Sequence, residues 1–171
     1  MKAKNLMRKN VLVSVVMGSE SDLPIMSEAT KILEEFEIPH ELFLTSAHRT
    51  PERTAKFAEG AAKRGVKIMI VGAGAAAHLA GVIASQTVLP VIGVPIDATS
   101  LHGLDALLST VQMPGGIPVA TMAIGKAGAK NAALFAVRVL AVENPDLKAR
   151  LDKYARKMAD DVEKKQLNLS G

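Results

Sequence analysis

The chain has 171 residues, 49% of them hydrophobic and only 3% aromatic, which predicts one domain with an aliphatic core. It contains no cysteine, which excludes disulfides, thiolate nucleophiles and cysteine-based metal sites and suits a cytoplasmic protein. The formal net charge of +4 equals the charge of the four basic side chains before the first predicted strand, which are Lys2, Lys4, Arg8 and Lys9. The rest of the chain is neutral overall. The charge therefore does not indicate a nucleic-acid-binding face.

Residues 1–10 are polar and lack the apolar segment of a secretion signal, so we expect them to form a flexible tail. No apolar run approaches the length of a membrane span, and no membrane partner is expected.

Strands and helices are predicted to alternate along the rest of the chain. Apolar runs bounded by turn residues indicate strands at residues 11–17, 40–45, 67–71, 91–94 and 119–124. Helical spacing of apolar residues indicates helices at about 24–36, 51–64, 78–87, 103–111, 127–142 and 146–165. Thr50 is the expected N-cap of the second helix, and Gly65 is its expected end.

This alternation predicts a flavodoxin-like α/β three-layer sandwich, with a five-stranded parallel sheet in the order 2-1-3-4-5 and an extra C-terminal helix. We expect residues 11–171 to form a single domain. Ligands in such folds bind beyond the carboxyl ends of the strands. The loops GSESD, TSAHRT and GAGAAAH follow the first three predicted strands and are expected to converge there.

The helix predicted at 127–142 is apolar on nearly all sides. A small domain can hardly bury such a helix alone, which indicates a subunit interface and a homo-oligomer. An ordinary core helix of high propensity is the alternative.

The loop GSESD precedes a helix N-terminus, where free N–H groups and the helix dipole favour an anion. Ser19 and Ser21 add hydroxyl donors. Asp22 is either an N-cap or an acceptor of hydrogen bonds from ribose hydroxyls. In the second loop, Arg49 could complete a phosphate site, and Ser46 offers a further hydroxyl.

His48 brings a group that titrates near neutral pH to the same loop. The alternative for this whole stretch is a solvated loop with a polar cap. His78, after the third loop, is either a satisfied structural histidine or a neighbour of His48. No histidines have metal-ligand spacing, and we expect no metal.

The third loop admits three interpretations. Gly72, Gly74 and Ala77 match a dinucleotide-binding fingerprint, with Asp97 as a candidate ribose-binding acid. Close packing of a helix on a strand is the second interpretation. The one we favour is that backbone N–H groups of this loop, around Gly74 and Ala75, bind a small anion.

Several segments together resemble the family of class I N5-carboxyaminoimidazole ribonucleotide mutases: MGSESD, SAHRTPER, GAGAAAHL, GVP, QMPGGIPVATMAI and NAALFAVRVLA. The resemblance covers roughly residues 11–142. It implies a flavodoxin-like homo-octamer that isomerises N5-carboxyaminoimidazole ribonucleotide to the 4-carboxy isomer in purine biosynthesis, without metal or organic cofactor.

The resemblance also implies residue roles. Ser19, Asp22 and Arg49 are expected to bind the ribonucleotide, with Ser46 close by. His48 corresponds to the catalytic histidine and His78 to a second active-site histidine. The chain departs from the family pattern at Ala75, where Gly is expected, and at Ala80, where Pro is expected.

Two other functions stay open from the sequence. One is a carboxylase that adds free carbon dioxide to aminoimidazole ribonucleotide, and the other is a non-catalytic dinucleotide-binding module built on GAGAAAH.

Overall fold

The structure is a computed structural model that describes residues 11–169, so the predicted flexible tail at residues 1–10 lies outside it. The chain divides into two compact units, one ending at Ala136 and the other beginning at Val137. The expectation of a single domain from residue 11 to residue 171 stays a prediction.

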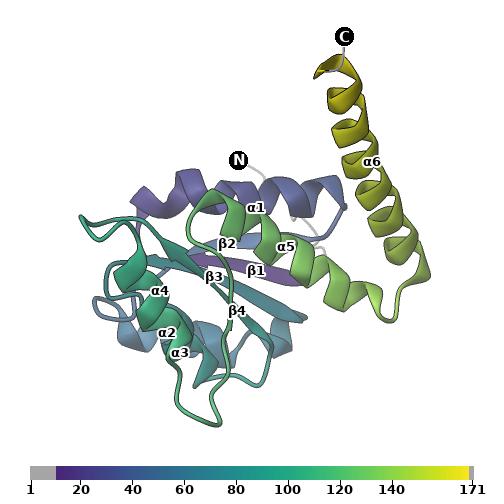
Figure 1. The fold of residues 1–171 in the computed structure, drawn as a ribbon. Coiled ribbons are helices and arrows are strands. Elements are labelled where there is room, and N and C mark those ends of the chain that lie inside the picture. The colour runs from purple at the N-terminus through teal and green to yellow at the C-terminus, as the bar shows by residue number, and fades with distance from the viewer. Residues whose placement is uncertain (1–10, 170–171) are drawn as a thin grey trace, which may run out of the picture. The chain divides into compact units, whose positions relative to one another are not determined.

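A five-stranded sheet forms the centre of the first unit (Figure 1). Its strands are β1 (Val13–Met17), β2 (His40–Leu44), β3 (Ile68–Gly74), β4 (Val91–Ile96) and β5 (Ala120–Thr121). All neighbours pair in parallel, in the order β2-β1-β3-β4-β5. The predicted flavodoxin-like topology is therefore confirmed.

Strand β5 is shorter than the predicted 119–124, since only Ala120 and Thr121 pair with β4. Pro95 explains the early end of this ladder. Its carbonyl accepts from the Gly125 N–H at 2.9 Å, so Pro95 faces the β5 side of β4. Proline has no N–H to donate there, and the ladder stops.

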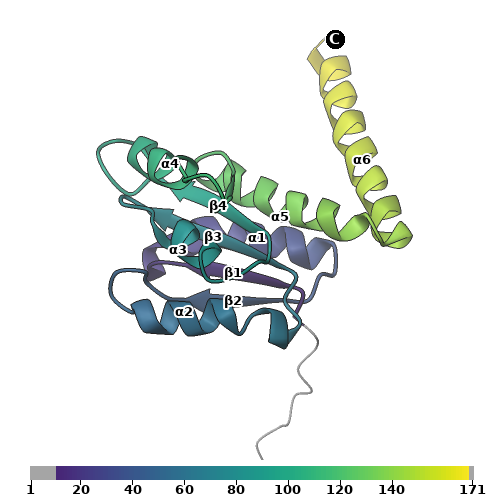
Figure 2. The same ribbon diagram turned by 90° about the horizontal axis from the view of Figure 1, so that it is seen from below.

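Helices cover both faces of the sheet (Figure 2). They are α1 (Leu23–Glu35), α2 (Pro51–Glu59), α3 (Leu79–Ala84) and α4 (Leu104–Val111). The prediction that α2 runs to Arg64 was wrong. The helix ends at Glu59, Gly60 follows, and a separate 3-10 turn, η2 (Ala62–Arg64), leads to Gly65 in the left-handed region at φ 94°. Glycine has low helix propensity and favours such an end.

Alternate residues of the central strands face opposite helices, as the pleat requires. Val16, Met69 and Val71 belong to a buried cluster with α2 and α3. On the other face, a Cβ added at Gly72 would lie only 2.2 Å from the sulfur of Met26 in α1. Gly72 therefore lets α1 pack tightly on β3.

The strand register brings three loops to one edge. Met17 of β1 lies beside Leu44 of β2 and Gly72 of β3. The chain leaves these strands at the same edge of the sheet, because parallel strands point the same way. The loops that follow therefore meet.

Two further helices follow the sheet. Helix α5 (Lys126–Ala141) buries Ala129, Ala132 and Ala133 but exposes Phe135. Helix α6 (Pro145–Leu169) is the predicted C-terminal helix, and it begins at Pro145. Among residues 11–169, no helix combines the length and hydrophobicity that a membrane span needs.

Candidate active site

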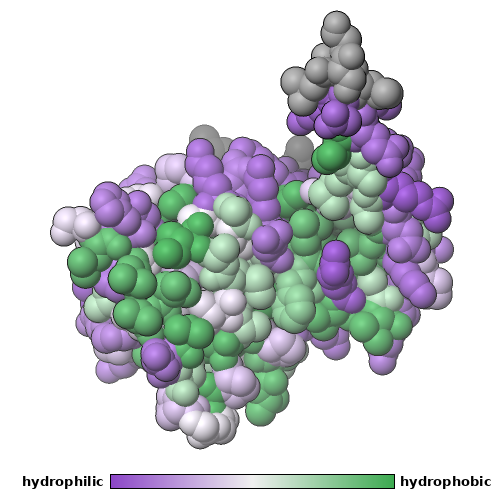
Figure 3. All heavy atoms as spheres, in the orientation of Figure 1, coloured by the Kyte–Doolittle hydropathy of each residue, from purple (hydrophilic) through white to green (hydrophobic). Residues whose placement is uncertain are grey.

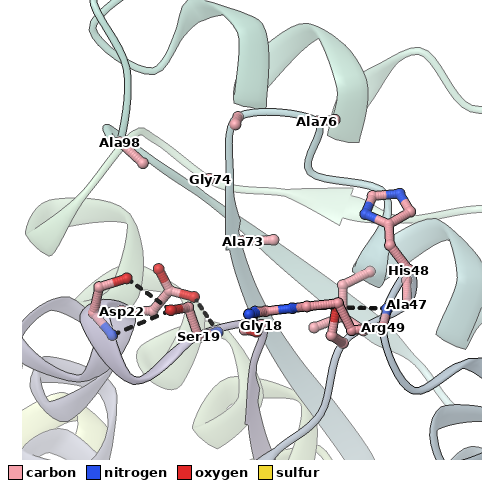
Figure 4. A pocket seen from close by; sticks show the side chains of 14 residues that line it. Gly18, Ser19, Asp22, Ala47, His48, Arg49, Ala73, Gly74, Ala76 and Ala98 are labelled. Atoms are coloured by element: carbon pink, nitrogen blue, oxygen red, sulfur yellow. Dashed lines mark hydrogen bonds between the residues drawn. The ribbon is translucent and has the colours of Figure 1, made fainter.

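A cavity of about 330 Å³ opens where the three loops meet (Figure 4). This volume is at the lower end of the range for small-molecule sites. Most of the residues predicted from the sequence to form the site line it: Ser19, Ser21, Asp22, Ser46, His48, Arg49, Gly74 and Ala75. His78 does not line the cavity but contacts His48.

The first loop turns sharply after β1. Ser19 caps the 3-10 helix η1 (Glu20–Asp22), and its hydroxyl oxygen accepts hydrogen bonds from the Ser21 hydroxyl at 2.9 Å and the Ser21 N–H at 3.4 Å. The Ser19 N–H donates to Oδ2 of Asp22 at 2.9 Å. These contacts form a capping box, which orders the loop before any ligand arrives.

Asp22 is buried, with only 4% of the residue exposed, although it lines the cavity. Burial raises its pKa, and this effect outweighs the hydrogen bonds from the backbone of Ser19 and Gly18 and the positive charge of Arg49. Asp22 stands at the N-cap position of α1, but its side chain makes no capping hydrogen bond to that helix. A buried carboxylate beside a cavity is an acceptor for ligand hydroxyl groups.

Arg49 links the first two loops. Its Nη2 donates to the carbonyl of Gly18 at 3.0 Å, and its backbone N–H donates to the Ser46 hydroxyl at 3.2 Å. No carboxylate pairs with Arg49 within the described part of the chain. A second cavity of about 460 Å³ shares Gly18, Ser19, Ser46 and Arg49 with the first. The guanidinium is therefore available to an anionic ligand.

The two histidines of the second and third loops lie in direct contact. Nε2 of His48 is 2.9 Å from Nδ1 of His78, and the two rings are nearly perpendicular at 81°. Both side chains are exposed. In such a bond one ring nitrogen donates and the other accepts, so a single proton lies between the two rings. This arrangement can give up or take up a proton at the cavity.

The third loop does not have the geometry of a dinucleotide fingerprint. Gly72 and Gly74 both lie within β3, and the helix that follows has only six residues. A Cβ at Gly74 would lie 2.5 Å from the Cβ of Ala98. Both glycines therefore serve close packing, which is the second of the interpretations open from the sequence.

Ala75 has a positive φ of 52°, in the left-handed region that favours glycine. It is one of the two positions at which the chain departs from the expected family pattern. The other, Ala80, is buried at the second residue of α3, where a proline would be tolerated.

Ala98 was not predicted from the sequence as a site residue, but it follows β4 and lines the cavity against Gly74. The signal was present, because β4 was predicted to lie next to β3 and its carboxyl end opens at the same edge. Within residues 11–169, no three His, Cys, Asp or Glu side chains group as metal ligands would.

Comparisons with known proteins agree with the fold and the loops. Residues 12–161 match the AIR carboxylase family. The N5-carboxyaminoimidazole ribonucleotide mutase of Pyrococcus horikoshii is 57% identical over 158 residues, which cover 92% of this chain and 88% of that protein. The phosphoribosylaminoimidazole carboxylase of Candida glabrata is 49% identical over 92% of this chain but only 27% of its own length.

Among solved structures, the crystal structure of Treponema denticola PurE has a TM-score of 0.76 and 28% sequence identity, and the match covers 90% of this chain and 97% of that one. The family match spans the whole sheet and all three loops of the cavity. This chain belongs to the AIR carboxylase family.

Proposed function

We propose that this chain isomerises N5-carboxyaminoimidazole ribonucleotide to 4-carboxy-5-aminoimidazole ribonucleotide in de novo purine biosynthesis. The observation that carries the proposal is the contact of 2.9 Å between His48 and His78 at a cavity that also holds Arg49 and Asp22. The 57% identity to a relative named as this mutase supports it.

The ribonucleotide is held at two points. Its phosphate binds the Arg49 guanidinium and the hydroxyls of Ser19 and Ser46, which line both cavities, and the hydroxyl of Ser21, which lines the first. Charged hydrogen bonds of this kind are stronger than neutral ones. The ribose hydroxyls donate to the Asp22 carboxylate. Binding at these points positions the base for the reaction.

The base lies toward His48 and the third loop, where the backbone at Gly74 and Ala75 and the small side chains of Ala73 and Ala76 line the cavity. Small residues leave space next to the base in which carbon dioxide can be retained once the bound ribonucleotide excludes water from it.

The chemistry needs one proton donor and one acceptor, used in turn. The bond between N5 and the carboxylate carbon breaks, its electron pair goes to N5, and protonated His48 donates a proton there. Carbon C4 then forms a bond to the released carbon dioxide, and neutral His48 removes the C4 proton. The sum is proton-neutral, so a single histidine suffices. His78 holds the His48 ring in place through the shared hydrogen bond.

A carboxylase that uses free carbon dioxide is the second candidate, because the Candida glabrata relative bears that name. The two reactions give the same product and differ in the substrate. A direct assay supplies the enzyme either with the N5-carboxylated ribonucleotide or with aminoimidazole ribonucleotide plus bicarbonate. The mutase proposal expects fast turnover of the first alone, and the carboxylase proposal expects fast turnover of the second.

Exposed apolar side chains support a homo-oligomer, which we propose to be an octamer that acts in the cytoplasm. Leu101, Leu104, Leu108 and Val111, which lie on and just before α4, are all about half exposed, at 48% to 59%. Figure 3 shows hydrophobic surface over α4. Phe135 of α5 is exposed as well. Such patches mark contact surfaces. Elution at the monomer size at micromolar concentration would contradict the octamer.

A further inference from the structure

Thr50 occupies the N-cap position of α2, but its hydroxyl does not cap that helix. Instead Oγ1 of Thr50 accepts from the Ser46 N–H at 3.0 Å and donates to the Ser46 carbonyl at 3.1 Å. The Thr50 N–H also donates to the same carbonyl, at 2.9 Å. One side chain thus holds both backbone polar groups of Ser46 and closes the loop between β2 and α2.

Two buried threonines, Thr45 and Thr54, lie next to the Thr50 hydroxyl. Oγ1 of Thr45 lies 3.1 Å from Oγ1 of Thr50 and 2.9 Å from Oγ1 of Thr54. Either hydroxyl of each pair can be the donor, so Thr45 joins Thr50 and Thr54 in one hydrogen-bond network. Thr45 and Thr54 are buried, at 3% and 0% exposure. Water therefore does not compete for the bond between Thr45 and Thr54, which is stronger in the interior than it would be at the surface.

The side chain of Ser46 connects this hydrogen-bond network to the cavity. Its Oγ accepts from the backbone N–H of Arg49 at 3.2 Å and from Arg49 Nε at 3.4 Å. Arg49 and Ser46 are also the two residues of this loop that line both cavities along with Gly18 and Ser19. A shift of the Ser46 backbone would therefore displace the guanidinium.

We propose that Thr50 is a positioning residue for substrate binding, which sets the Ser46 backbone and through it the Arg49 guanidinium. The identity of the ligand, a ribonucleotide monophosphate, rests on the proposed function. Thr50 itself does not touch the reacting atoms. His48 lies in the same loop but also contacts His78 of the third loop, so we expect Thr50 to act on binding more than on turnover.

The test compares Thr50→Val, which keeps the branched shape and removes the hydroxyl, with Thr50→Ser, which keeps the hydroxyl. Since Thr50 makes no side-chain cap bond, α2 stays intact in both. We expect Thr50→Val to raise the KM for the N5-carboxylated ribonucleotide, and the Kd for its 4-carboxy product, by about tenfold, or about 1.4 kcal/mol. The change in kcat stays below about threefold, and Thr50→Ser restores most of the affinity.

The matched control is Thr30→Val, because Thr30 Oγ1 donates to a backbone carbonyl in α1, remote from the cavity. It leaves KM and kcat at the wild-type values. In a Ser46→Ala background, Thr50→Val changes KM by less than about twofold, because the two substitutions break the same path. Thr54→Val, which removes a weaker bond to the Ser46 carbonyl at 3.3 Å, gives a smaller rise and serves if Thr50→Val does not fold.

Several results would overturn the inference: wild-type KM in Thr50→Val, a loss in kcat alone, failure of Thr50→Ser to restore binding, or full additivity with Ser46→Ala. If Thr54→Val is the variant that is used, an unchanged KM overturns it. These outcomes are separate from the proposed function, which fails when the wild-type protein itself neither binds nor converts the ribonucleotide.

Discussion

Nε2 of His48 lies 2.9 Å from Nδ1 of His78, although the two residues are 30 positions apart in the chain. One belongs to the loop after β2 and the other to the loop after β3. The parallel sheet brings the two loops to one edge. The bond fixes the position of the His48 ring, and the cavity that His48 lines is where the proton is needed.

His48→Asn keeps a side chain of similar size that can hydrogen-bond but cannot exchange a proton. We expect turnover to fall about 10²–10⁴-fold, the range for a lost general acid–base group, while the Kd for the ribonucleotide changes little. His40→Asn is the control, because His40 bonds to the Ile38 carbonyl at the opposite end of β2. Normal turnover by His48→Asn, or an equal loss in both variants, would remove His48 from the mechanism.

A ligand without a phosphate distinguishes the role of Arg49 in binding from that of Asp22. Arg49→Ala should weaken the binding of a ribonucleotide monophosphate by about 1.5–3 kcal/mol, the range for a charged hydrogen bond. It should leave the binding of the matching nucleoside unaffected. Asp22→Ala should weaken the binding of both ligands, because Asp22 is proposed to bind the ribose. Calorimetry with the two ligands measures this. Equal losses for both ligands in Arg49→Ala would place the phosphate elsewhere.

The sequence predicted the sheet order and which loops form the site, because both follow from the pattern of apolar runs and loop residues. It could not predict element ends that depend on tertiary contacts. Strand β5 is short because Pro95 ends its ladder on that side, and α2 is short because Gly60 interrupts it. The spacing of apolar residues alone predicts neither the end of β5 nor the end of α2.

At the site, residue types predicted the members of the cavity but not their contacts. The roles of glycines in β3 became clear only with Met26 and Ala98 in place, since close packing and phosphate binding use the same residue type. Thr50 was correctly placed at the N-cap of α2. The target of its hydroxyl, Ser46, depends on how the loop folds back.

The raised pKa of Asp22 makes a prediction about stability and pH. Folding favours the protonated form, so the contribution of Asp22 to stability is fully present below its ordinary value of 3.8 and is lost as pH rises through the raised pKa. At neutral pH the buried charge is a cost. Asp22→Asn keeps an acceptor for the Ser19 N–H without the charge.

The Tm of Asp22→Asn relative to wild type should therefore increase between about pH 4 and pH 7, while ribonucleotide binding is weakened. Thermal unfolding at several pH values measures the difference. A difference in Tm that stays constant with pH would contradict a raised pKa for this carboxyl.

Ala75 carries strain that glycine would relieve, because its φ is 52°. The left-handed region costs a non-glycine residue about 1–2 kcal/mol, and the greater freedom of glycine in the unfolded chain offsets about 0.4–1 kcal/mol of the gain. Ala75→Gly should thus stabilise the fold by about 0.5–1 kcal/mol. Ala76→Gly, at a neighbour without positive φ, should destabilise it by about 0.4–1 kcal/mol. Denaturant unfolding of both variants measures the signs, and a destabilised Ala75→Gly would contradict the account.

The fate of the carboxylate tests the central claim most directly. The wild-type enzyme is given N5-carboxyaminoimidazole ribonucleotide labelled with ¹³C in its carboxylate, in an excess of unlabelled bicarbonate, and the product carboxylate is analysed by mass spectrometry. A mutase that retains its own carbon dioxide in the cavity yields product in which most of the label remains. Complete loss of the label to the bicarbonate pool would contradict the mutase and favour the carboxylase.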